Sequence, residues 1–316
     1  MDSETFWKNF KLGEEVQIAG RFIFNGLRSF HEMEHLYNYD EVFETLYNLA
    51  VGLERLLKVA IILTDDGSSD QETLEKSLIT HDHQSLLARL RKNSSLKFST
   101  VHNDFISLLS TFYNTHRYDR YGLAAMSVES KEKMALHRFF KKHLNIEIKN
   151  NPPFDISPNT DQMRKFIGRT VGKLTKTIYE LVYTTATDLG IFTYEVRGDS
   201  KAAKIFLSES YDFLDEDVLW RELLIFFMNE REERGWIKFL RETEPLPFDP
   251  GLACEFLEAF ASTEKMINVM GELEALYEGI DAKKDRIERI RAIGNRGIVF
   301  EYDEEGDEAE DLADRD

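Results

Sequence analysis

Residues 51–63 read VGLERLLKVAIIL and form the centre of a long apolar segment. Around this stretch, apolar residues recur at steps of three and four, at Leu46, Leu49, Leu53, Leu56, Leu57, Ala60 and Ile61. This spacing places their side chains on one broad stripe of an α-helix. Asp40 stands where a residue would cap the first turn. The pattern predicts a core helix over 40–64.

Two further helices are expected soon after it. Residues 80–90 read THDHQSLLARL, which opens with capping residues and continues with a leucine seam. The next apolar positions at helical spacing are Val101, Phe105, Leu108, Leu109 and Phe112, and residues 113–118 then read YNTHRY. These closely spaced helical patterns indicate a mainly α fold.

The order of these pieces resembles the HEPN superfamily of antiparallel helical bundles. The likeness rests on a long helix with Glu54 and Lys58, on a His-Asp pair before a leucine-rich helix, and on a helix that closes on Tyr, three residues and Arg-Tyr. It covers about the first 190 residues. It implies a bundle that often dimerises, binds RNA or nucleotides in some branches, and acts as a metal-independent ribonuclease in others. Many such proteins belong to bacterial toxin–antitoxin or antiviral defence systems.

The rest of the chain also reads as mostly helical. Besides the three helices above, helical patterns are expected over 16–37, 130–144, 160–188, 201–207, 218–228, 235–241, 252–260 and 264–277. The HEPN pattern makes 160–188 the last bundle helix and 119–159 a basic insertion. We therefore expect an HEPN-like bundle over 1–190 and a second helical region over 191–300. The β content should be small at most, with short strands at 191–196 and 298–302.

Composition indicates a folded protein without a membrane segment. The 316 residues are 42% hydrophobic, enough for a full core. No secretory leader pattern is present at the amino end, and no run approaches about 18 uninterrupted apolar residues. We expect a cytoplasmic protein. The single cysteine, Cys254, cannot form an internal disulfide and is expected to be a small core residue.

The net charge of −18 is distributed unevenly. Residues 301–316 hold ten acids and one base, a net −9, and are expected to form a disordered acidic tail. Residues 131–176 hold eleven bases and four acids, a net +7. An anionic ligand such as RNA would be drawn to the second segment.

The resemblance also directs attention to an Arg and a later His with four to six residues between them. In HEPN ribonucleases the His is the acid or base and the Arg stabilises phosphate charge, so no metal is needed. Arg138 and His143 fit the spacing and are the expected catalytic pair, although Phe139 stands where the family has a polar residue. A second match over 28–35 lies in the first helix. The alternative for Arg138 is a plain cationic helix face.

A second set of residues could bind the ligand. In nucleotide-binding members of the superfamily the His-Asp and Arg-Tyr elements lie near one another. The resemblance thus points to His81, Asp82, Arg117, Tyr118 and Arg120, and the positive charge of the basic insertion adds Lys141 and Lys142 as ligand contacts. Two alternatives stay open: Asp82 caps a helix, or Arg117 pairs with Asp82 or Glu54 inside the bundle. His81 and His83 lack a third ligand, so neither a metal site nor a cofactor is expected.

The leading functional hypothesis is a homodimeric protein that binds RNA or a nucleotide, with metal-independent ribonuclease activity as its catalytic form. Either His143 or His81 would then be the acid or base. The alternative is a non-catalytic helical adaptor whose protein partner docks on 191–300. That region contains an aromatic run that favours a core role over an interface, at Trp220, Phe226, Phe227, Trp236 and Phe239.

Overall fold

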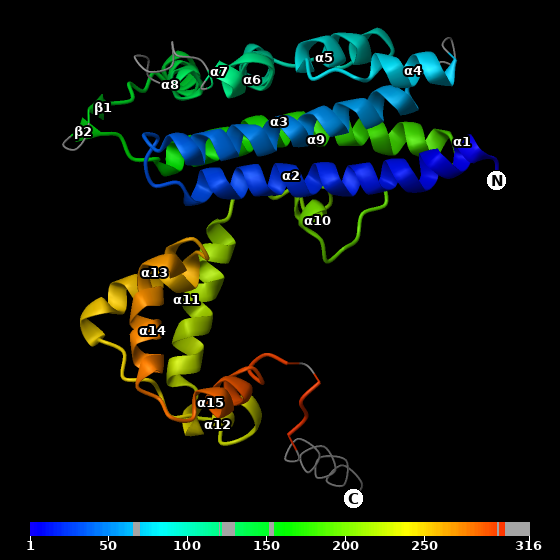
Figure 1. Cartoon of the computed structure of the whole chain (residues 1–316). Helices are drawn as coiled ribbons and strands as arrows, with labels where there is room; N and C mark the ends of the chain where they lie inside the picture. The colour runs from blue at the N-terminus through cyan, green and yellow to red at the C-terminus, as the bar shows by residue number, and fades with distance from the viewer. Residues whose placement is uncertain (66–69, 120, 122–129, 152–154, 296, 301–316) are drawn as a thin grey trace, which may run out of the picture. The chain divides into compact units, whose positions relative to one another are not determined.

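The protein is mainly α-helical and falls into two compact units, Met1–Phe213 and Leu214–Asp316 (Figure 1). The computed structural model describes residues 1–65, 70–119, 121, 130–151, 155–295 and 297–300. The expected acidic tail, 301–316, lies outside the described residues.

Unit 1 contains α1 (Ser3–Phe6), η1 (Trp7–Lys11), α2 (Leu12–Glu32), α3 (Tyr39–Leu63), α4 (Gln71–Ser77), α5 (His83–Lys92), α6 (Thr100–Thr111), η2 (Phe112–His116), α7 (Arg117–Asp119), α8 (Lys131–Leu144), β1 (Asn150–Asn151), β2 (Asp155–Ile156), α9 (Asp161–Asp188) and α10 (Lys201–Phe206). Unit 2 contains α11 (Leu214–Asn229), α12 (Gly235–Glu242), η4 (Pro250–Leu252), α13 (Ala253–Ala261), η5 (Lys265–Val269), α14 (Met270–Glu278) and α15 (Lys283–Ile290).

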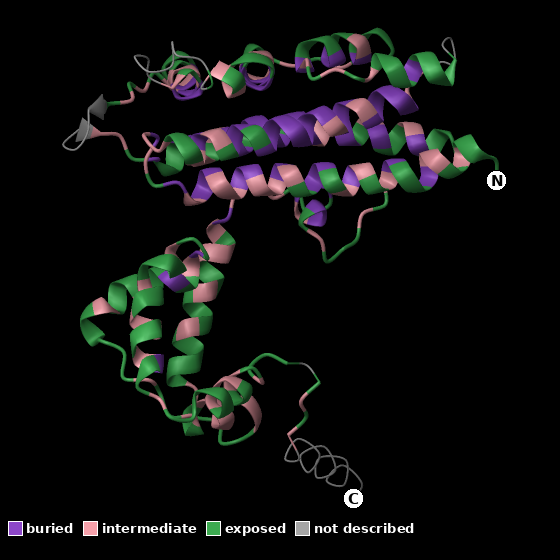
Figure 2. Ribbon diagram, in the orientation of Figure 1, coloured by how far each residue is buried: buried purple, intermediate pink, exposed green. Residues whose placement is uncertain are grey.

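Helix α3 is the centre of unit 1. It packs on the long helices α2 and α9 and also on the shorter helices α5, α6 and α8, which Figure 1 shows as a separate row. Figure 2 shows α3 buried along most of its length. All five residues over 59–63 are buried, so the apolar stripe widens here to the whole circumference. A helix that is apolar all round is stable in water only when other elements surround it.

Helices α2 and α3 approach closely because each presents a glycine to the other. A Cβ added at Gly26 would lie 2.7 Å from the side chain of Leu49. One added at Gly52 would lie 2.6 Å from the side chain of Ile23 and 2.9 Å from its backbone nitrogen. Both glycines lie inside helices, where glycine is unfavourable by about 1 kcal/mol relative to alanine. Close packing of the two helices offsets this cost.

The helix of the expected basic insertion belongs to the core of unit 1. Phe139 and Phe140 of α8 are buried. The ring of Phe140 stacks on Phe30 at 6.1 Å between centroids, and the ring of Phe139 lies 5.4 Å from Phe105. Helix α8 therefore buries its apolar side against α2 and α6. Lys133 is buried with it, and the exposed basic residues are Lys131, Arg138, Lys141 and Lys142.

Residues 191–213 belong to unit 1, so the division comes at Phe213 and not at the expected position 190. The expected strand over 191–196 is wrong, since these residues form turns. Thr193 is fully buried and its hydroxyl donates to the Lys8 carbonyl oxygen at 2.6 Å. Helix α10 packs on α2. Burial of side chains on the bundle therefore decides where this segment belongs, and its local β propensity does not.

The β structure of the described residues is one short antiparallel pair of strands and an isolated bridge between His35 and Pro158. Strands β1 and β2 pair Asn150 with Ile156 and Asn151 with Asp155. This small hairpin lies in the proline-bearing segment between α8 and α9. It agrees with the expectation of a small β element but lies elsewhere in the chain.

Unit 2 has few buried residues. Among its described residues only Ala259, Ser262 and Tyr277 are buried. Helix α11 has no buried residue at all, although most of its side chains are apolar. Phe226 and Phe227 of the expected aromatic core are each 47% exposed. Trp236 and Phe239 do contact each other, with 5.6 Å between ring centroids.

Candidate functional site

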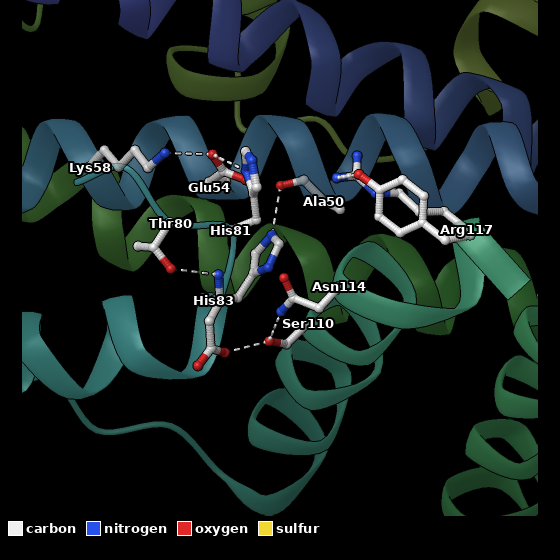
Figure 3. A network of polar contacts seen from close by, with 11 residues as sticks. Ala50, Glu54, Lys58, Thr80, His81, His83, Ser110, Asn114 and Arg117 are labelled. Atoms are coloured by element: carbon white, nitrogen blue, oxygen red, sulfur yellow. Dashed lines mark hydrogen bonds and ion pairs between the residues drawn. The ribbon is translucent and has the colours of Figure 1, made fainter. Parts of the chain in front are cut away.

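A histidine and a buried carboxylate meet where the segment before α5 passes α3 (Figure 3). Nδ1 of His81 lies 3.1 Å from Oε2 of Glu54. Oε1 of the same carboxylate accepts from Nζ of Lys58 at 2.6 Å. Glu54 and Lys58 are one helical turn apart on α3, which places both side chains on the same face.

The two partners differ in their exposure. The side chain of Glu54 is only 9% exposed, whereas that of His81 is 52% exposed. The carboxylate therefore holds the imidazole through Nδ1, and Nε2 remains on the open side of the ring. A histidine oriented in this way by a carboxylate has the arrangement of a general acid or base.

Tyr113 joins this dyad to Arg117. Its ring centroid lies 5.1 Å from that of His81 and 3.7 Å from Cζ of Arg117. The guanidinium also lies 4.5 Å from the ring of Tyr118, and Nη2 donates to the hydroxyl of Tyr118 at 2.6 Å. Burial raises the pKa of Tyr113, and the charge of Arg117 opposes that rise. Tyr113 is therefore a neutral aromatic wall between the imidazole and the guanidinium.

The local backbone geometry orients the side chains of Tyr113 and Arg117. Residues Phe112–His116 form the π-helical turn η2 at the end of α6, and Arg117 opens α7 directly after it. Single π-turns within helices occur frequently at functional sites. This turn lets Tyr113 face α3 while Arg117 lies over its ring.

Arg117 has no carboxylate partner among the described residues. Its Nε is buried and makes no hydrogen bond to any described group. The ion pairs found for Glu54 are with Lys58 and His81, and the contacts of Asp82 are with other groups. The alternative that Arg117 pairs with Asp82 or Glu54 is thus not found in the described part of the chain.

Asp82 is the N-terminal cap of α5. Its carboxylate accepts from the backbone of Gln84 at 3.1 Å, from the hydroxyl of Ser110 at 2.6 Å, and from Ser85. Burial opposes its ionisation, but these hydrogen bonds outweigh that effect and hold the pKa of Asp82 below its ordinary value. The capping interpretation of Asp82 therefore describes its contacts, and the cap fixes His81 beside Glu54.

His83 is the fully buried neighbour. Its Nε2 lies 2.7 Å from the carbonyl oxygen of Ala50, so this nitrogen carries the hydrogen and donates. Burial lowers the pKa of His83. The side chain ties α5 to α3 and takes no part in an open site.

Arg138 and His143 point to different surroundings. The ring of His143 packs against Phe139 at 4.9 Å, its side chain is 9% exposed, and its Nε2 lies 2.8 Å from Oδ2 of Asp104. Arg138 is exposed, with Nε donating to the Met134 carbonyl oxygen. Five residues along an α-helix turn the side chain well away from the first position. No contact joins this pair among the described groups.

Arg138 instead shares a shallow hollow with His116. The hollow measures about 260 Å³ and is lined by Asp104, Ser107, Leu108, Thr111, His116, Ala135, Arg138, Phe139 and Lys142. Lys142 binds Asp104 at 2.5 Å, and this contact holds the pKa of Asp104 below its ordinary value. Lys141 lies apart from it, paired with Glu147 at 2.9 Å.

The second Arg-His match, over 28–35, is bound up in packing. Arg28 pairs with Glu32 at 2.5 Å and lies over the ring of Phe213. His31 is buried. Arg120, the remaining expected ligand contact, lies outside the described residues.

Two residues of the cluster, Glu54 and Tyr113, were not among the expected site residues. Glu54 was noted as a landmark of the resemblance and as an alternative partner of Arg117. The i, i+4 spacing of Glu54 with Lys58, and of Tyr113 with Arg117, is a signal that could have identified both. His116, which lines the hollow beside Arg138, was not expected either.

Other classes of site are not found in the described part of the chain. No group of three or more His, Cys, Asp or Glu there could hold a metal ion. No helix there is both long enough and apolar enough to cross a membrane. Cys254 is exposed, contrary to the expected core position.

Comparisons of the chain with protein-family models, curated proteins and solved structures find no match. The chemistry of the cluster is therefore the basis for its interpretation.

Proposed function

We propose that unit 1 binds RNA or a nucleotide at the cluster formed by Glu54, His81, Tyr113, Arg117 and Tyr118. The observation that carries this proposal is the guanidinium of Arg117, which is stacked on two tyrosines without a carboxylate partner among the described residues. A phosphate supplies the negative charge that this guanidinium lacks among the described residues.

The tyrosines provide the second half of the recognition. Tyr118 is 56% exposed and adjoins the guanidinium, so a base can stack on it while the phosphate contacts Arg117. Stacking on aromatic side chains is the common mode by which proteins hold unpaired bases. The exposed lysine and arginine side chains of α8 and α9 add a positive electrostatic potential that attracts a longer RNA strand.

The His81–Glu54 dyad supports metal-independent cleavage as the catalytic form of this function. Nε2 of His81 takes the proton of a ribose 2′-hydroxyl, and the oxygen attacks the adjacent phosphorus. The bond from phosphorus to the 5′-oxygen breaks, and that oxygen takes a proton from water. Arg117 stabilises the added negative charge on the phosphate oxygens. Glu54 holds the imidazole and stabilises its protonated form.

Of the two expected acid–base candidates, His81 is the better placed. The ring of His81 is half exposed and contacts Glu54 through Nδ1, so Nε2 is left for a substrate. In His143 it is Nε2 that contacts Asp104, and the ring packs among aromatic side chains. The Arg138–His143 pair stays a prediction for a dimer in which a second copy completes the site. The HEPN resemblance supports that dimer and a role in bacterial defence or a toxin–antitoxin system.

The test uses the full chain with EDTA and a short fluorescein-labelled single-stranded RNA. Anisotropy measures binding and gel electrophoresis measures cleavage. Replacing Arg117 with Gln should weaken binding about tenfold, the usual worth of a charge-assisted contact to phosphate. Replacing His81 with Asn should leave binding within about twofold and abolish cleavage.

Arg91→Gln is the matched control, because Arg91 is an exposed arginine of α5 that contacts only Asn103 and the ring of Phe98. Equal affinity of the Arg117 and Arg91 variants would remove the proposed site. Cleavage that survives His81→Asn but is lost in His143→Ala would move the acid–base role to His143. ATP in place of RNA distinguishes a nucleotide ligand from a strand.

A further inference from the structure

Helix α11 presents an apolar stripe to solvent. Leu219, Leu223 and Phe226 follow one another at i, i+4 and i+7 and share one face of the helix. They are 57%, 45% and 47% exposed. Trp220 and Leu224 lie about 100° further round the helix and are half-buried. Val218, Ile225, Phe227 and Met228 are exposed as well, so the stripe is one part of a helix that exposes apolar side chains in most directions.

Such a stripe indicates a helix-binding surface. Anchors at i, i+4 and i+7 are the spacing by which an apolar helix face meets a partner helix. Contiguous exposed apolar side chains are rare on monomers and mark interaction sites. Leaving three large apolar side chains in water forgoes the favourable transfer that their burial would bring.

The same face is acidic. Asp215 and Glu222 stand four residues before Leu219 and four before Phe226, so both carboxylates lie along the stripe. Both residues are exposed. The surrounding chain has the same sign, since residues 214–278 hold sixteen acids and six bases, a net −10.

We propose that the stripe of α11 is the docking site for a cationic amphipathic helix of another protein. The apolar side of that helix packs on Leu219, Leu223 and Phe226, and its Lys or Arg residues meet Asp215 and Glu222. Opposite charges along such an interface speed association and exclude wrong partners. Met266 and Met270 are also exposed in unit 2, and flexible methionines adapt to helices of different shape.

Charge also decides against the other occupants. Two copies that met through this stripe would bring Asp215 and Glu222 of one copy against the same acids of the other, or against further acids of the net-negative segment. Like charges at close range oppose association. Nucleic acid and an anionic lipid surface carry the wrong sign for the same reason.

The probe is a synthetic peptide of about 18 residues with leucines at every third and fourth position and lysines elsewhere, fluorescently labelled. A second peptide has glutamate in place of every lysine. The full chain should bind the lysine peptide, and its affinity for the glutamate peptide should be at least about tenfold lower. Equal binding of the two peptides would overturn the proposal.

Two variants localise the binding. Leu219→Ser with Phe226→Ser should weaken the lysine peptide about tenfold or more, because two apolar anchors are lost. The matched control is Leu189→Ser with Phe192→Ser, another exposed Leu and Phe pair, 52% and 57% exposed, in unit 1. Circular dichroism checks that both variants keep the helix content of the parent. Unchanged peptide binding by the α11 variant would overturn the proposal.

Asp215→Lys with Glu222→Lys tests the charge separately. This variant should bind the lysine peptide more weakly and the glutamate peptide more tightly than the parent. Sedimentation velocity and phosphatidylcholine vesicles test the other occupants. Self-association or vesicle binding that disappears in the Leu219→Ser, Phe226→Ser variant would assign the stripe to a second copy or to lipid, and would overturn the proposal.

Discussion

Nδ1 of His81 lies 3.1 Å from the carboxylate of Glu54, although 27 positions separate the two residues in the sequence. Helix α3 supplies the carboxylate and the residues before α5 supply the imidazole. The contact forms because Asp82 caps α5 and so fixes where His81 must lie. One structural cap thus positions a group with the arrangement of an acid–base catalyst.

Replacing Glu54 with Gln should destabilise unit 1 by about 2 kcal/mol, because Lys58 and His81 lose a largely buried charge partner. Urea denaturation followed by circular dichroism measures the change. The control is Glu14→Gln, whose side chain is 60% exposed and pairs only with Lys11, and which should cost well under about 1 kcal/mol. Equal effects of the two substitutions would show that the buried carboxylate contributes no more than a surface one.

Replacing Arg117 with Lys should weaken RNA binding even though the charge is kept. A lysine cannot stack its head group flat between Tyr113 and Tyr118, and it cannot offer a planar pair of donors to phosphate. We expect a loss of about fivefold to tenfold in affinity with the salt dependence unchanged. Anisotropy titrations at several salt concentrations measure both quantities. Full affinity in Arg117→Lys would mean that only the positive charge matters.

The stability of unit 1 should fall as pH drops below 6.5, the ordinary histidine value, because burial lowers the pKa of His83 in the folded chain. The unfolded chain then takes up a proton that the folded chain refuses, so stability is complete above 6.5 and is lost below it. The slope for one histidine is at most about 1.4 kcal/mol per pH unit.

His83→Gln should reduce that slope while keeping a donor for the Ala50 carbonyl oxygen. Burial also lowers the pKa of His102 and His116, so part of the pH dependence will remain. Urea midpoints at a series of pH values between neutrality and mild acid measure the slope. A parent and a variant with parallel curves would exclude His83 as the titrating group.

Replacing Gly52 with Ala should cost about 2 kcal/mol or more, because its Cβ would meet the backbone and side chain of Ile23 at under 3 Å. Gly13→Ala, in the same pair of helices, meets only the Thr193 carbonyl oxygen at 3.8 Å. It should be neutral or stabilising by up to about 1 kcal/mol. Thermal unfolding of the two variants gives the comparison, and similar melting temperatures would contradict the close approach of α2 and α3.

Helix positions were largely predictable from the sequence. The expected helices over 40–64, 130–144 and 160–188 match α3, α8 and α9 to within a residue or two at each end. Apolar periodicity and capping residues carry this information within a short window. The same local signals were misleading at 191–196, where Ile191 and Thr193 are buried on the bundle in an irregular segment, and at the boundary of unit 1.

The site was predictable only in part. His81, Arg117 and Tyr118 do lie together, whereas Arg138 and His143 match a sequence spacing without sharing a helix face. Glu54 and Tyr113 were not among the expected site residues, because their importance comes from contacts between separate helices. Gly26 is a similar case, since the benefit of a glycine inside this helix is a close approach to α3 that no local window contains.

The two close approaches of α2 and α3, at Gly26 and Gly52, also determine how unit 1 can move. Sliding α2 along α3 by one turn, about 5.4 Å, would drive a side chain into backbone on both sides at once. These two helices therefore act as a rigid spine. If a ligand binds at the proposed cluster and displaces Arg117 or His81, we expect the short helices of the outer row to move while α2 and α3 stay fixed.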